Sequence, residues 1–226
     1  MSLYDKARSR SVDNLQVLYA FVVGLAVTEA LRRLLTDPVT GSVGVGWSEA
    51  FVFVSLIVTV VPFFHGANRY LDASYVTGER GSTNVALMVD FFLLFIQGIW
   101  FFALALLADD VRIFYTALAG LLVFDIVWVS STLLHGRSKP GEPRLAYTKW
   151  MLVNVAASAL LFLFSWSDLI GWASPLGQEV FLMVVVVART VFDYVYSWDF
   201  YYPSPAPAPE SVARSSHVVQ PERSDP

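Results

Sequence analysis

Polar and ionisable side chains interrupt the long apolar stretches of this sequence, where charged groups are costly and usually functional. The candidates for binding a proton, a small ion or a small polar solute are His65, Asn68, Arg69, Asp90, Asp125, Arg189 and Asp193. Aspartate and histidine bind and release protons, and one guanidinium group can hydrogen-bond two carboxylates. Four supporting residues are expected around them, and these are Gln97, Trp128, Asn154 and Glu29.

A polar stripe follows a proline in the second apolar stretch. Its members are His65, Asn68, Arg69 and Asp72. Their i, i+3, i+4, i+7 spacing places them on one face of a helix. Pro62 precedes the stripe, removes one helical hydrogen bond and should free a carbonyl oxygen at residues 56–59. A kink followed by a polar stripe is typical of a helix that lines a cavity.

Helix geometry brings ionisable groups of four helices to a similar depth. Alternate helices run in opposite directions with a rise of about 1.5 Å per residue, which places these groups between the membrane midplane and the inner leaflet. The charged residues of this layer are Asp90, Asp125, Asp193, Arg69 and Arg189. They are neutral together when His65 is protonated or one aspartate carries a proton. We expect them to meet, either as a site for protons, ions or polar solutes or as a structural ion-pair network with Arg189 as its hub.

The composition places the elements that carry these residues in a membrane. Of the 226 residues 56% are hydrophobic and only 15% are charged, whereas soluble proteins average about 25% charged residues. The formal net charge of -4 disfavours a nucleic-acid partner. The absence of cysteine excludes disulfides and cysteine chemistry, and the sequence has no phosphate-binding glycine motif and no H-E-x-x-H motif. We therefore expect no cofactor and no metal site.

Six apolar stretches of about 20 residues can each cross a bilayer as a helix. They are residues 15–35, 50–71, 85–107, 113–134, 145–166 and 180–200. The predicted fold class is all-α, a polytopic six-transmembrane-helix bundle over residues 1–202. The first stretch contains Glu29 followed by Arg32 and Arg33, which favours a local ion pair and indicates a retained signal-anchor. Residues 203–226 are predicted to form a disordered, Pro-rich cytoplasmic tail.

The distribution of basic residues predicts the orientation of the spans. Lysine and arginine gather in the N-terminal segment, in the loops after the second and fourth spans, and in the tail. The opposite loops are mainly acidic. Because basic residues favour the cytoplasmic side, we predict a multi-pass protein of the plasma or inner membrane with both termini cytoplasmic.

Three classes of function remain open for such a protein. The leading hypothesis is a small channel or transporter-like protein that handles protons or a small ion, which would not be an enzyme. The second is a membrane-embedded enzyme acting on lipid or peptide, with His65 as a base. The third is an accessory or scaffold membrane subunit whose buried charges are purely structural. The expected partners are the lipid bilayer, a second copy of the chain and a protein bound by the Pro-rich tail.

Overall fold

A computed structural model describes residues 3–36, 41, 43–77, 83–134, 144–166 and 174–202. Of these residues 91% are helical and none lies in a strand, which confirms the all-α class. Six helices within this part are long and apolar enough to cross a membrane. The orientation of the termini stays a prediction, and the predicted tail, residues 203–226, lies outside the described residues.

The helices follow the predicted spans closely in the middle of the chain. The long helices are α1 (Leu3–Leu35), α2 (Trp47–Leu71), α3 (Asn84–Leu106), α4 (Val111–Leu134), α5 (Arg144–Trp166) and α6 (Pro175–Tyr196). A π-helical turn, η1 (Asp72–Val76), continues α2, and a one-turn helix, α7 (Trp198–Tyr201), follows α6. The second to fifth spans agree with the observed helices to within three residues, because their apolar runs end at polar loops.

The first helix begins well before the predicted start of the first span. The basic N-terminal segment is helical from Leu3, and Val12, Leu15 and Tyr19 form a buried stripe at i, i+3, i+7. This early part of α1 packs against η1, and the Arg8 guanidinium lies 5.2 Å from the centre of the Tyr75 ring. The helix extends beyond the apolar run because an amphipathic face continues to find a packing partner.

The predicted bounds of the sixth span were also displaced. Ser174 accepts a hydrogen bond from the Gly177 amide at 3.2 Å, and Pro175 occupies the first helical turn, so α6 begins before residue 180. At the other end α6 stops at Tyr196, and the chain turns at Ser197 into α7. The stretch predicted as one span is therefore a long helix followed by a separate short one.

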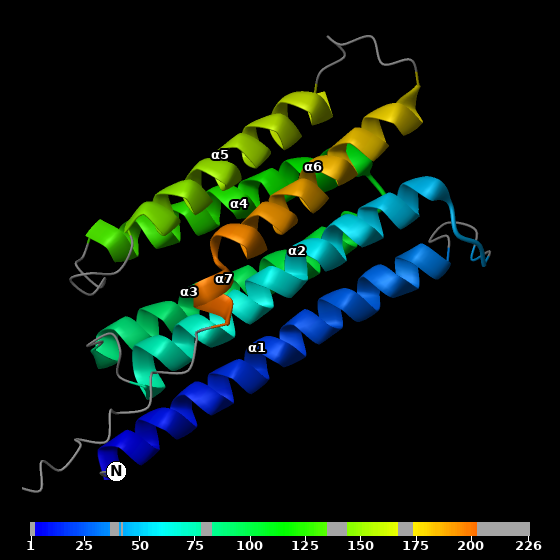
Figure 1. The fold of residues 1–226 in the computed structure, drawn as a ribbon. Helices are drawn as coiled ribbons and strands as arrows, with labels where there is room; N and C mark the ends of the chain where they lie inside the picture. Colours follow the sequence, from blue (N-terminus) through cyan, green and yellow to red (C-terminus); the bar gives the residue numbers. More distant parts are fainter. Residues whose placement is uncertain are drawn as a thin grey trace, which may run out of the picture.

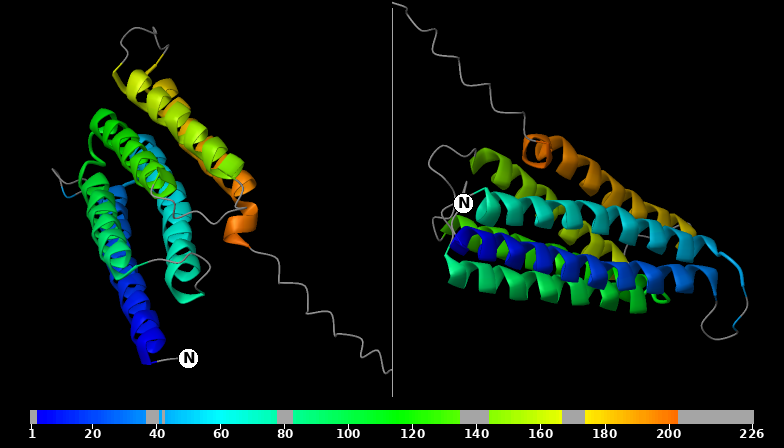
Figure 2. Two further views of the ribbon diagram at one scale, coloured as in Figure 1. Left: turned by 90° about the vertical axis from the view of Figure 1, so that its left-hand side faces the viewer. Right: turned by 90° about the horizontal axis from the view of Figure 1, so that it is seen from below.

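The six long helices close a ring. Around this ring α1 packs against α2, α2 against α6, α6 against α5, α5 against α4, α4 against α3, and α3 against α1. Successive helices of the chain run in opposite directions, so the neighbouring pairs α1/α3 and α2/α6 are parallel (Figures 1 and 2). Helix α2 also contacts α3 and α4 across the ring, which makes it the central element of the packing.

Small residues allow the closest helix contacts. A Cβ atom on Gly98 of α3 would lie 3.0 Å from Cγ1 of Val22 and 3.6 Å from Cδ2 of Tyr19, so only glycine fits this contact with α1 without a shift. Ser158 lies in a run of small residues in α5, residues 156–159, and donates to the Ala119 carbonyl of α4 at 2.9 Å. Such small residues are typical of helix interfaces in membranes, where close packing replaces the hydrophobic effect.

Replacing Gly98 by leucine should separate α1 from α3 and lower the free energy of unfolding in detergent by about 1–3 kcal/mol. Gly24 of α1 is the matched control, because a Cβ there meets nothing within 4 Å. Gly24→Leu should be neutral or slightly stabilising, since leucine favours helix more than glycine does. Thermal unfolding of the two variants checks this, and equal losses would contradict the proposed contact.

Candidate functional site

Arg189 of α6 is buried at the junction of three helices. Its side chain is 2% exposed, and its Nε donates to Oδ1 of Asn154 on α5 at 2.8 Å. Its Nη1 lies 3.2 Å from Oδ2 of Asp193, and its guanidinium carbon lies 5.0 Å from the centre of the Phe63 ring on α2. Arg189 therefore pairs with the aspartate one turn later on its own helix, and it joins α2, α5 and α6.

Asp125 of α4 completes this group, which we call the arginine cluster (Asp125, Asn154, Arg189 and Asp193). Asp125 is 7% exposed and lies within electrostatic range of both Arg189 and Asp193. If all three ionisable groups are charged, the cluster carries two negative charges and one positive charge. One proton makes it neutral, which a low-dielectric interior favours.

The proline inside α2 is a point where α6 attaches. Pro62 has no amide hydrogen for the Val58 carbonyl one turn earlier, and Thr190 donates its hydroxyl to that carbonyl at 2.8 Å. The sequence predicted a freed carbonyl at residues 56–59, and the structure shows what satisfies it. Thr190 follows Arg189 directly, so the register of α6 is fixed at the same level as the arginine cluster.

His65 lies beside the arginine cluster among tyrosine rings. Its ring centre is 4.7 Å from that of Tyr201, 5.4 Å from that of Tyr202 and 6.2 Å from that of Tyr194. The Tyr201 hydroxyl lies 3.3 Å from each carboxylate oxygen of Asp193 and donates into that group. Tyr201 therefore connects the half-buried His65 to the buried carboxylate.

The rest of the polar stripe contacts neighbouring helices. Arg69 donates from Nε to the Phe200 carbonyl of α7 at 3.1 Å. Gln16 of α1 donates to the Asn68 carbonyl at 3.4 Å and to Oδ1 of Asp72 at 2.9 Å. These members of the stripe predicted to line a cavity instead join α2 to α1 and α7.

Asp90 of α3 lies in a different group, the Asp90 cluster (Tyr70, Tyr75, Asp90 and Trp128). Asp90 is fully buried, and its carboxylate accepts hydrogen bonds from Tyr70 at 2.9 Å, from Trp128 Nε1 at 3.3 Å and from Tyr75. The two tyrosines are five residues apart at the π-helical turn, where the i→i+5 pattern differs from that of an α-helix. The carboxylate thus ties together α2, η1, α3 and α4.

Two further supporting residues have separate partners. Gln97 accepts a hydrogen bond from Tyr19 at 2.7 Å, and Tyr19 is within electrostatic range of Asp125. Glu29 pairs with Arg32 at 2.7 Å and Arg33 at 2.8 Å, as the sequence predicted. Glu29 therefore belongs to the surface of one helix end.

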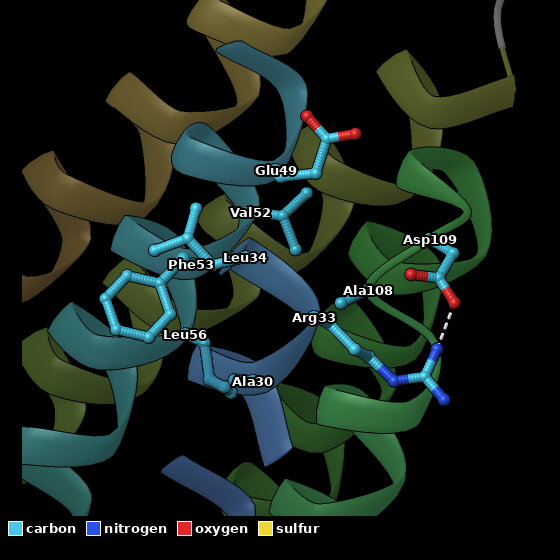
Figure 3. Close-up of a pocket in the computed structure, with 9 residues that line it drawn as sticks. All are labelled: Ala30, Arg33, Leu34, Glu49, Val52, Phe53, Leu56, Ala108 and Asp109. Atoms are coloured by element: carbon cyan, nitrogen blue, oxygen red, sulfur yellow. Dashed lines mark hydrogen bonds and ion pairs between the residues drawn. The ribbon is translucent and has the colours of Figure 1, made fainter. Parts of the chain in front are cut away.

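A small pocket lies near that helix end, away from both clusters. Arg33 crosses from α1 to pair with Asp109, while the Glu49 carboxylate points away from this pair (Figure 3). The cavity measures about 10 Å³, which is the room that one water molecule needs. This pocket is too small for a substrate.

Sequence reasoning missed the hydroxyl groups that complete these clusters. Tyr201, Thr190 and Tyr75 each donate to a buried oxygen of a distant helix or to a carboxylate. Thr190 had a signal in the sequence, since a proline in an apolar helix requires a donor from elsewhere. Tyr75 had none, because the π-helical turn cannot be derived from residue spacing.

The Thr190 hydroxyl should contribute to stability mainly because Pro62 has no amide hydrogen for the Val58 carbonyl. Thr190→Val should lower the free energy of unfolding by about 1 kcal/mol, because the Val58 carbonyl loses its donor. The loss should be smaller in a Pro62→Ala background, where residue 62 regains an amide hydrogen. Thr28→Val is the control, since the exposed Thr28 bonds a carbonyl of its own helix at 2.8 Å. Unfolding in detergent measures all four variants, and no coupling between residues 62 and 190 would refute the assignment.

Asp90→Asn should destabilise the protein by about 1–3 kcal/mol, because an amide offers one acceptor oxygen where the carboxylate offers two. Asp110→Asn is the control, since the exposed Asp110 caps α4 and asparagine caps equally well. Tyr75→Phe should cost less in the Asp90→Asn background than alone. Additive losses in chemical unfolding would argue against this hydrogen-bond cluster.

Comparisons with known proteins identify no relative of this chain. No protein-family model matches the chain, and no curated protein and no solved structure matches it significantly. The six apolar helices are compatible with a membrane protein. Any finer statement of function rests on the two clusters.

Proposed function

We propose that this chain is a small membrane transport protein in which the Asp125 carboxyl group binds and releases a proton as protons or a small ion cross the membrane. The observation that carries this proposal is the position of Asp125. It lies buried in the middle of an apolar helix and within electrostatic range of Arg189 and Asp193. Ionisable groups at such positions are rare in membrane proteins and commonly mark ion pathways or proton relays.

The charge of the arginine cluster supports proton binding. Arg189 and Asp193 pair, so Asp125 contributes the uncompensated charge when it is ionised. A charged side chain at the centre of a membrane helix costs about 2.5–3.5 kcal/mol on insertion scales. A group that is neutral with one proton and charged without it can alternate between two states as the proton enters and leaves.

Polar side chains near Asp125 suggest a route for the proton. Asp193 accepts from Tyr201, whose ring packs against the half-buried His65. Histidine changes its charge close to neutral pH, which suits a group that exchanges protons with water. We infer that water molecules entering beside Tyr201 and Asp193 carry protons between His65 and Asp125, because ring packing between His65 and Tyr201 provides no hydrogen bond.

A structural role for the arginine cluster is the second candidate. Its support is the tight surrounding of Arg189, which is held at once by Asn154, Asp193 and the Phe63 ring. The enzyme hypothesis has less support, because no hydrogen bond joins His65 to a carboxylate within the described residues. A general base of that kind needs a partner or a substrate within hydrogen-bond reach.

Proton flux into proteoliposomes distinguishes transport from a structural role. With a pH-sensitive dye inside the vesicles and an imposed pH gradient, Asp125→Asn should lower the rate by about a hundredfold, because the amide cannot bind the proton. The unfolding free energy of this variant should stay within about 1 kcal/mol of the parent, since asparagine preserves shape and removes no cation.

Asp110→Asn is the matched control, because Asp110 is an exposed aspartate that caps the start of the same helix, and the flux of this variant should be unchanged. Arg189→Met should lower the free energy of unfolding by about 3–5 kcal/mol, since it leaves a buried carboxylate without its cation. Absence of flux in the parent, together with this loss in Arg189→Met, would favour the structural role and refute the proposal.

A further inference from the structure

We propose that residues 197–202, which we call the clasp, form a hinged cover over Asp193 that opens the arginine cluster to water. This inference rests on the proposed function, because it concerns access to the same carboxylates. The clasp comprises Ser197, the single turn of α7 and Tyr202. It lies beside the last third of α2, where it contacts Pro62, Gly66 and Arg69, and η1 extends α2 to ten residues beyond Gly66 (Figure 1).

The inner side of the clasp covers the carboxylate. Tyr201 is 7% exposed, and its hydroxyl lies 3.3 Å from both oxygens of Asp193. The Ser197 hydroxyl is 3.4 Å from Oδ1 of the same group. Asp193 is itself only 3% exposed, so the side chains of the clasp complete its separation from solvent.

Glycine at position 66 makes room for this cover. A Cβ atom there would lie 3.4 Å from the Tyr201 hydroxyl and 3.6 Å from its ring. The Tyr201 side chain thus packs against both Gly66 and the His65 ring of α2. The clasp and α2 are in close contact, but no ion pair joins them among the described residues.

The attachments of the clasp are few and weak. Its hydrogen bonds to α2 are the 3.1 Å bond from Arg69 to the Phe200 carbonyl and the 3.4 Å contact of Tyr201 with the Pro62 carbonyl. Hydrogen bonds at 3.3–3.4 Å are longer than the usual range, and a single helical turn has little stability by itself. The outer side chains Trp198 and Tyr202 are 56% and 48% exposed.

The consequence is a cover that can turn away at Ser197 without disturbing α6. When it is closed, Tyr201 shields Asp193 and connects it to His65. When it is open, water reaches Asp193 between α2 and α6, and the Arg189–Asp193 pair remains within one helix. Local openings of this kind are expected where a segment has few buried contacts and exposed side chains.

Carboxyl labelling tests the cover independently of transport. In the detergent-solubilised full chain, a water-soluble carbodiimide with glycine methyl ester modifies carboxyl groups that water reaches, and peptide mass spectrometry gives the rate at Asp193. Tyr201→Ala should raise this rate about tenfold, and Tyr201→Phe should raise it less, because it keeps the ring and loses only the hydroxyl.

Trp198→Ala is the matched control, since it removes an exposed aromatic side chain from the same turn and should leave the labelling of Asp193 unchanged. The exposed Asp110 reports equal reagent access in every variant, and thermal unfolding shows that each variant is folded. Equal labelling of Asp193 in the parent, Tyr201→Ala and Trp198→Ala would overturn the cover.

Flux in proteoliposomes separates this inference from the proposed function. Faster labelling and faster proton flux in Tyr201→Ala support both. Faster labelling in a protein without any flux supports the cover and refutes transport. Flux that depends on Asp125, with labelling and rate unaffected by Tyr201→Ala, supports transport and refutes the cover.

Discussion

A guanidinium group buried among apolar helices constrains much of the surrounding structure. Arg189 cannot lose its charge and cannot reach water from its position, so the protein must surround it with acceptors. Asn154 on α5 accepts a hydrogen bond from it, Asp193 of its own helix forms an ion pair with it, and the Phe63 ring of α2 faces the cation. Each of these contacts requires a particular rotation and height of its helix. One residue therefore fixes how α2, α5 and α6 meet.

The proline in α2 takes part in the same junction. Pro62 leaves a carbonyl without its helical donor, and Thr190, next to Arg189, supplies the missing hydrogen bond. One turn beyond the proline, Gly66 allows Tyr201 to approach the backbone and shield Asp193. A proline, a glycine and a buried ion pair thus lie near one another where α2 and α6 meet.

The sequence predicted some of the site and missed the rest for identifiable reasons. The Arg189–Asp193 pair follows from i, i+4 spacing, and the Glu29 pairs follow in the same way, since both are local. Asp90 was expected near Arg189 because their estimated depths agree. It instead accepts hydrogen bonds from Tyr70, Tyr75 and Trp128. Depth along a helix axis says nothing about which side of a helix faces which neighbour, and the π-helical turn changes that side.

Composition and apolar run lengths alone determined that this is an all-helical chain with six helices long enough to cross a membrane. The hydropathy of a segment is the sum of the contributions of its residues, so it can be calculated from the sequence without knowledge of the tertiary structure. Tertiary structure alone decided the extension of α1 to Leu3, the break at Ser197, and the separation of the buried charges into two clusters. Those features depend on contacts between helices that are distant in sequence. A hydrogen bond across a helix interface is set by rotation and register, which the linear order of residues does not contain.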